Sequence, residues 1–193
     1  MNQIADRYRR LSEHFIDLVE RVPDDAWTSP SPCDGWTARD VVAHVVDVHG
    51  MMLKPLHRGL SDAPAVADDP AGAVRSATAD VQRVLDDPES AGTEYDGYFG
   101  PTTVQATIDR FLGIDLVVHA WDLASAAGLD EQIAETELAR VRADVEDLGD
   151  NMRAPNVVGP PLDPPADASE QDRLLAFLGR DPHWTPGTAK ARA

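Results

Sequence analysis

Hydrophobic residues recur at intervals of three and four positions along most of the chain. This spacing places them on one face of an α-helix. Four stretches with this pattern predict helices, at residues 3–22, 37–52, 70–85 and 133–149. Pro23 ends the first stretch, and Thr37 with Asp40 resembles a capping box at the start of the second.

The stretch from Thr102 or Thr103 to Ala127 differs, because its hydrophobic residues point in every direction around a helix. A helix that is apolar all round lies at the centre of a protein. Gly128 is the expected end of this helix. A short helix is predicted at residues 171–178, and no stretch has the two-residue period of a strand. The sequence therefore predicts an all-α protein, a four-helix bundle with a short additional C-terminal helix.

The end of the chain has a different composition. Residues 151–167 contain five prolines and no hydrophobic period. We therefore predict a helical bundle at residues 1–149, and a segment at residues 150–193 that wraps the surface, with a short helix and a frayed tail.

The charge of the chain excludes several classes of partner. Its 17 basic and 34 acidic residues give a formal net charge of −17, which repels nucleic acid and anionic membrane surfaces. No apolar run approaches the roughly 20 residues that cross a bilayer. Cys33 is the single cysteine and cannot form an internal disulfide. We expect a cytoplasmic protein that binds neither nucleic acid nor membranes.

Three polar residues interrupt the apolar run IDLVVHAWDLA at residues 114–124, namely Asp115, His119 and Asp122. Their spacing of four and three residues places them on one stripe of a helix that faces the interior. Burying a carboxylate costs several kcal/mol unless it is paired or binds a metal. Two groups four residues apart on a helix can reach the same ion. A metal site and an internal Asp–His hydrogen bond are both compatible with this pattern.

A metal site needs a third ligand from another part of the chain. The run DVVAHVVDVHG in the second predicted helix offers His44 and His49, and periodicity does not choose between them. Two histidines and one carboxylate leave coordination positions open for water or substrate, as in catalytic rather than structural metal sites.

Two stretches resemble signatures of the mycothiol-dependent maleylpyruvate isomerase family, which belongs to the DinB-like superfamily. They are SPSPCDGWTARDVVAHVV at residues 29–46 and IDLVVHAWDLASAAG at residues 114–128. LLAFLGRDPHW at residues 174–184 resembles the tail of small actinobacterial members. The C-terminal domain of the full-length isomerase is not recognisable in residues 150–193.

The resemblance implies a DinB-like four-helix bundle that holds a divalent metal through His44, Asp115 and His119. Family members often have Glu at the position of Asp115, so the side chain in this sequence is one methylene shorter. Zinc is the metal that we expect, with nickel or iron as alternatives. A homodimer is expected from the resemblance alone.

The resemblance also implies a function, a transferase or isomerase in which a small thiol such as mycothiol attacks a small electrophile. A bound metal would lower the pKa of the thiol. A metal-dependent hydrolase and a non-catalytic, dimeric metal- or ligand-binding protein are the alternatives.

Other residues near these motifs have two interpretations. We expect His49 to be exposed or hydrogen-bonded at a helix end rather than a ligand, and Asp47 to face solvent. Asp122 either orients a ligand histidine or caps local structure. Cys33 has no evident basic partner, so we expect it to pack in a turn rather than to react as a thiol. Recognition of an acidic thiol or substrate needs basic residues near the site, and four are available, namely Arg39, Lys54, Arg58 and Arg110.

Overall fold

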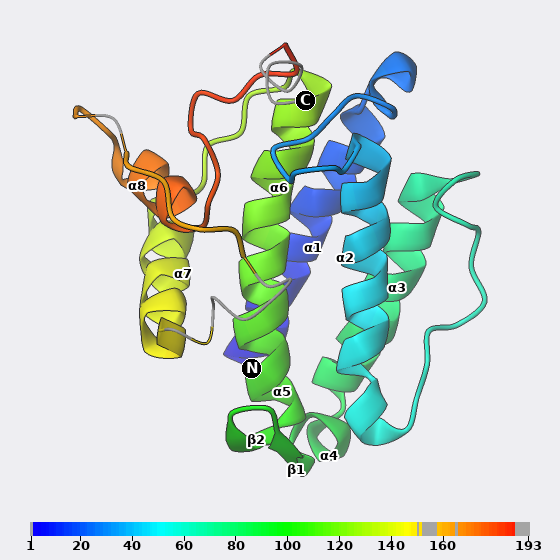
Figure 1. Cartoon of the computed structure of the whole chain (residues 1–193). Coiled ribbons are helices and arrows are strands. Elements are labelled where there is room, and N and C mark those ends of the chain that lie inside the picture. Colours follow the sequence, from blue (N-terminus) through cyan, green and yellow to red (C-terminus); the bar gives the residue numbers. More distant parts are fainter. Residues whose placement is uncertain (1, 150, 152–157, 165, 188–193) are drawn as a thin grey trace.

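The computed structural model describes residues 2–149, 151, 158–164 and 166–187. Its body is formed by four long helices, α1 (Gln3–Arg21), α2 (Ala38–Met52), α3 (Pro70–Asp86) and α6 (Gly113–Ala127). Figure 1 shows that α1 and α6 run in one direction while α2 and α3 run in the other. Each of the four contacts two of the others, so they enclose one apolar core. The predicted all-α, DinB-like four-helix bundle is confirmed.

Local sequence signals set the ends of these helices. Asn2 accepts hydrogen bonds from the first backbone amides of α1, and Thr37 and Asp40 form the predicted capping box of α2. Gly128 ends α6 in the left-handed conformation, with φ of 69°, which glycine adopts without strain. Two single turns of 3-10 helix, Asp24–Ala26 and Lys54–Leu56, lie in the loops on either side of α2.

The predicted continuous helix from Thr102 or Thr103 to Ala127 is present, but it is not α-helical throughout. Thr103 caps a short helix α5 (Val104–Thr107), which continues through a π-helical stretch (Ile108–Leu112) into α6. A π-helical turn contains more residues than an α-helical turn, and hydrophobic periodicity does not reveal it in an apolar run.

No strand was predicted from the sequence, and this was wrong for the segment before α5. It contains α4 (Pro88–Ala91) and an antiparallel hairpin of β1 (Glu94–Gly97) and β2 (Gly100–Thr103). Each strand has four residues and three of these eight positions are glycine or proline, so a two-residue hydrophobic period has no room to develop.

Two further helices cover one side of the bundle (Figure 1). Helix α7 (Glu135–Leu148) packs against α6, and α8 (Glu170–Phe177), the predicted short C-terminal helix, packs against α7. A second apolar cluster between α6, α7 and α8 includes Val118, Val141 and Leu174. The division of the chain at residue 149 stays a prediction. Part of the proline-rich segment and of the tail, at residues 150, 152–157, 165 and 188–193, lies outside the described residues.

None of the helices described meets the length and hydrophobicity that spanning a bilayer requires.

Candidate metal centre

The three residues predicted as ligands meet at one point between α2 and α6. His44 Nε2 lies 3.6 Å from one carboxylate oxygen of Asp115, and His119 Nε2 lies 3.9 Å from the other. The two imidazole rings are 4.9 Å apart between centroids. One donor atom from each residue lies within 4.8 Å of the others, a spacing at which the three donors face a common centre.

These donor atoms are free to bind an ion. Both nitrogen–oxygen distances exceed a hydrogen bond, and among the described residues neither Nε2 has a hydrogen-bond partner. Burial would raise the pKa of Asp115, but the imidazoles of His44 and His119 outweigh burial and hold that pKa below its ordinary value. Two imidazoles and one carboxylate form a donor set that suits zinc and related divalent ions. The residues therefore fit the metal that the sequence led us to expect.

The tautomer of His119 is set by Asp122. His119 Nδ1 lies 2.9 Å from Asp122 Oδ2, so Nδ1 carries the proton and donates it, and Nε2 keeps its lone pair. Of the two roles that the sequence left open for Asp122, the structure shows orientation of a candidate ligand. Trp36 packs against both rings, with its centroid 4.8 Å from that of His44 and 6.1 Å from that of His119. The place of this tryptophan at the site was not predicted from the sequence.

Asp122 has two further partners. Arg180 Nη2 lies 3.0 Å from Asp122 Oδ2, and Cys33 Sγ donates to the same oxygen at 3.2 Å. Asp122 is fully buried, and burial would raise its pKa, but the charge of Arg180 and the bond from His119 hold the pKa far below its ordinary value. The carboxylate is therefore ionised, and the buried guanidinium balances its charge.

Cys33 has a basic partner after all, contrary to the expectation from sequence. Arg180 Nη2 lies 3.3 Å from Cys33 Sγ, although 147 residues separate the two. Burial raises the pKa of the Cys33 thiol, and the nearby Asp122 raises it further, which outweighs Arg180. The thiol is therefore protonated, in keeping with the expectation that Cys33 packs in a turn rather than reacts.

Cys33, His119 and Asp122 form a second group whose donor atoms lie close together. The guanidinium of Arg180 already contacts Cys33 and Asp122 there. Because a cation occupies this position and His119 Nδ1 holds a proton, the group with His44 and Asp115 is the better candidate metal centre.

His49 does not join either group. Its side chain is fully buried, and Nδ1 lies 2.6 Å from the carbonyl oxygen of Val45. The structure therefore shows the hydrogen-bonded role that the sequence favoured, although the ring is not exposed. Asp47, on the same helix, faces solvent as predicted.

Asp115 and His119 line a cavity of about 910 Å³. Of the four basic residues considered from the sequence, Arg110 lines it, whereas Lys54 and Arg58 are exposed elsewhere and Arg39 lies over the ring of Trp27. The other two arginines of the lining, Arg140 and Arg180, were not predicted from the sequence. Arg180 belongs to the stretch LLAFLGRDPHW that resembles the tail of family members, but no local pattern in the sequence places Arg180 or Arg140 near the site.

The fold and the site together define the class of protein, a helical bundle in which the second helix and an Asp-x-x-x-His helix bring three candidate ligands together beside a cavity that two of them line. Residues 8–124 match the family described as the mycothiol maleylpyruvate isomerase N-terminal domain, and the chain belongs to this family. The matched region contains all three candidate ligands, whereas Arg180 lies outside it.

The chain is also similar to two uncharacterized proteins from two strains of Mycobacterium tuberculosis. Each is 30% identical over 185 residues, and the match covers 90% of this chain and 95% of the relative. A comparison with solved structures finds no significant match.

Proposed function

We propose that the chain is a divalent-metal-dependent enzyme that transfers or isomerises a small electrophile with the help of a thiol of the mycothiol type. The observation that carries this proposal is the convergence of donor atoms from His44, Asp115 and His119, of which Asp115 and His119 line a large cavity. Membership of the mycothiol maleylpyruvate isomerase N-terminal domain family supports the choice of thiol.

The three side chains would hold the metal, zinc by preference, with nickel or iron also compatible with the donor set. A divalent cation in this position supplies Lewis acidity, which lowers the pKa of a thiol or water placed beside it. A divalent ion held by three protein ligands would keep coordination capacity for a thiol or water.

The chain's own residues prepare this site. Asp122 keeps the proton of His119 on Nδ1, so Nε2 stays available. Trp36 limits the rotation of both imidazole rings by packing against them. Val118 and Leu178 contribute to the apolar part of the lining of the same cavity.

Elemental analysis of the purified protein tests the ligand assignment. We expect one equivalent of divalent metal per chain, and loss of most of it in His44→Ala and in His119→Ala. His14→Ala is the matched control, because His14 is an exposed histidine on α1 that pairs with Glu131. If both ligand variants keep full metal occupancy, the assignment is wrong.

A second measurement tests whether the hydrogen bond from His119 to Asp122 supports metal binding. Asp122→Asn keeps a hydrogen-bond acceptor but removes the charge beside His119. We expect the metal affinity to fall about 10- to 100-fold. Competition with a chromophoric chelator measures this fall, and Asp47→Asn, which alters an exposed carboxylate on α2, should leave the affinity unchanged.

Assays with the metal-loaded protein separate the three functions that the sequence left open. Conjugation or isomerisation that requires added mycothiol supports the proposal. Hydrolysis of esters or amides without a thiol would replace it with a hydrolase, and ligand binding without turnover would replace it with a non-catalytic role. The homodimer stays a prediction from the resemblance, which sedimentation equilibrium of the purified chain tests.

A further inference from the structure

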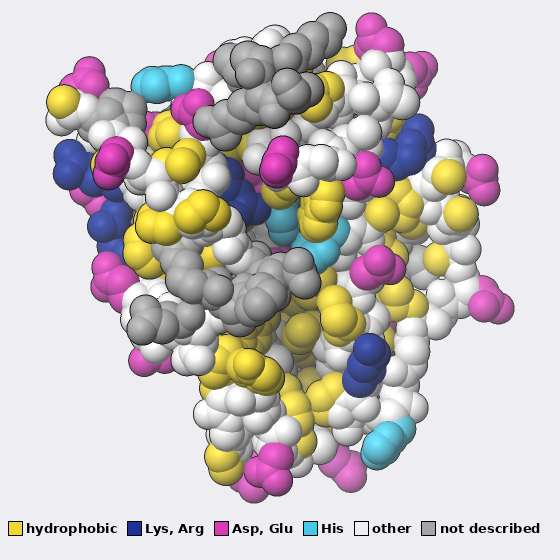
Figure 2. All heavy atoms as spheres, viewed as in Figure 1, with side chains coloured by type: hydrophobic (Ala, Val, Ile, Leu, Met, Phe, Trp, Pro, Cys, Tyr) yellow, Lys and Arg dark blue, Asp and Glu magenta, His cyan; other side chains and the backbone are white. Residues whose placement is uncertain are grey.

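The cavity beside the candidate metal centre has a predominantly apolar wall. Four aromatic residues line it, namely Tyr95, Tyr98, Phe99 and Phe111, together with aliphatic side chains of α6 and α7. Figure 2 shows hydrophobic side chains, and histidine at one end, around the hollow in the middle of one face. Its volume of about 910 Å³ lies in the range of small-molecule sites and has room for a thiol and a second reactant.

The aromatic rings are arranged next to the candidate ligands. Phe99, from the turn of the hairpin, stacks on Phe111 with centroids 5.9 Å apart and ring planes 19° apart. Phe111 precedes Asp115 by four residues, a rise of about 6 Å along a helix. An aromatic molecule bound against Phe111 would therefore reach the candidate centre.

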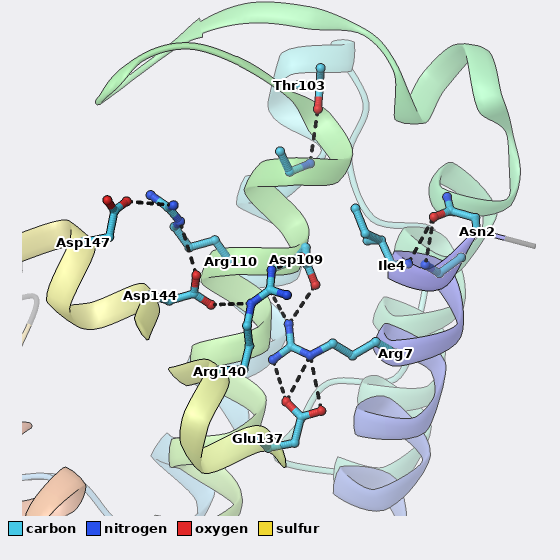
Figure 3. Close-up of polar contacts among 12 residues, drawn as sticks. Asn2, Ile4, Arg7, Thr103, Asp109, Arg110, Glu137, Arg140, Asp144 and Asp147 are labelled. Carbon is cyan, nitrogen blue, oxygen red and sulfur yellow. Dashed lines mark hydrogen bonds and ion pairs between the residues drawn. The ribbon is translucent and has the colours of Figure 1, made fainter. Parts of the chain in front are cut away.

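Two arginines in the cavity wall are already bound by carboxylates (Figure 3). Arg110 Nη2 lies 2.9 Å from Asp147 Oδ2. Arg140 Nε lies 3.2 Å from Asp144 Oδ2, and its Nη2 contacts Asp109. Asp144 also faces the guanidinium of Arg110. The protein's own carboxylates therefore neutralise these two positive charges, and neither arginine needs an anionic ligand as a partner.

The third arginine of the described lining, Arg180, is bound by Asp122. Three arginines and three aspartates line the described part of the cavity, so their formal charges cancel. To pair with an arginine, a carboxylate ligand would have to displace one of the protein's own carboxylates. Otherwise it would lose its hydration shell without gaining a positively charged partner. An uncharged ligand meets neither penalty.

We infer that this cavity binds an uncharged aromatic electrophile and discriminates against its carboxylate-bearing counterpart. The inference rests on the proposed function, in which a thiol is activated at the candidate metal centre. With an aryl epoxide, the thiolate sulfur forms a bond to a ring carbon of the epoxide while that carbon–oxygen bond breaks. The epoxide oxygen then takes up the proton that the thiol has lost, so the product is a hydroxy thioether and no group leaves.

Methyl benzoate and benzoate form a matched pair of probes, because they differ chiefly in charge. Their affinities for the full-length protein can be measured by isothermal titration calorimetry, first without metal and then with zinc. Without metal, the carboxylate of benzoate has no ion to bind. We expect methyl benzoate to bind the metal-free protein at least about tenfold more tightly than benzoate. Equal affinities, a preference for benzoate, or no binding of either probe would overturn the inference.

This measurement needs neither thiol nor turnover. If the ligand variants keep their metal and methyl benzoate is still preferred, the proposed function fails while the binding preference stands. If thiol-dependent turnover is found but benzoate binds as tightly as its ester, the proposed function stands and the inference fails.

Two substitutions locate the preference in the cavity. Phe111→Leu should weaken methyl benzoate binding about fivefold, because it removes the aromatic face next to Asp115. Asp144→Asn should strengthen benzoate binding about fivefold, because it frees part of Arg110 and Arg140. Asp86→Asn is the control, since Asp86 pairs with Arg9 outside the cavity. If neither Phe111→Leu nor Asp144→Asn changes its probe's affinity, the probes bind elsewhere and the inference is wrong.

Discussion

At the residue scale, two histidines on the same helix have different chemistry because their surroundings differ. His44 is partly exposed, and its Nε2 lies 3.6 Å from a carboxylate oxygen of Asp115. His49 is fully buried beside Tyr8, with Nδ1 bound to the carbonyl of Val45, and has no partner for Nε2 among the described residues. Burial lowers the pKa of His49 from 6.5 to about 4 and outweighs the bond to Val45 and the charge of Asp115.

This lowered pKa predicts how stability depends on pH. As the pH falls, the unfolded chain protonates His49 near 6.5, whereas the folded chain does so only near 4. The stability associated with the neutral ring is therefore complete above pH 6.5 and is lost toward pH 4, by about 3 kcal/mol. Urea unfolding between pH 7 and pH 4 measures this loss. In His49→Gln the loss over that range should be smaller by the same amount, and parallel curves for the two proteins would contradict the prediction.

At the scale of elements, the π-helical stretch Ile108–Leu112 decides how α6 enters the site. One extra residue in a turn rotates the following helix by about 100° relative to a continuous α-helix. The same region is tied to α1 and α7 by Arg7, which bonds to Asp109 and Glu137 (Figure 3). Gly113, the first residue of α6, lets this guanidinium approach, because a Cβ there would lie 2.6 Å from Arg7 Nη1.

We therefore expect Gly113→Ala to destabilise the protein by about 1–2 kcal/mol, although alanine normally favours a helix. The methyl group displaces a buried guanidinium from its carboxylate partners. In an Arg7→Met background the same substitution should be neutral or stabilising by about 0.5–1 kcal/mol. Chemical denaturation of the four proteins gives the interaction energy, and an equal effect in both backgrounds would show that Arg7 is not the cause.

At the scale of the whole molecule, the C-terminal part completes the site that the bundle begins. Arg180 follows α8 and is buried against Asp122, which orients His119. Its backbone amide donates to Leu175, and its side chain donates to the carbonyl of Leu178. The position of this arginine therefore depends on how α8 packs against α7.

Two core substitutions distinguish an effect of α8 packing on the metal site from a simple loss of stability. Leu174 of α8 and Val141 of α7 are both buried in the cluster that joins these helices. Leu174→Ala should cost about 2–4 kcal/mol, and Val141→Ala somewhat less, because it removes fewer carbon atoms. Only Leu174→Ala should also weaken metal binding, by about three- to tenfold, through the displacement of Arg180. Denaturation and chelator competition measure the two effects, and equal metal affinities in both variants would argue against the coupling.

Local patterns in the sequence determined the helical class, most helix ends and the pairing of Asp115 with His119. These features depend on residues within a few turns of one another, and the geometry of a single helix is sufficient to predict them. Residues 37–52 show this clearly, since the capping box and the valine stripe predicted the helix that the structure contains.

The tertiary structure decided what helix geometry leaves open. Around one helix, His44 and His49 are both at the edge of the apolar stripe, and only the packing of α2 against α6 places His44 beside Asp115. Arg180 reaches Cys33 and Asp122 across 147 and 58 residues, and the carboxylates that neutralise the cavity's arginines come from several elements. Such contacts depend on the rotation and packing of whole helices, which no local period in the sequence encodes.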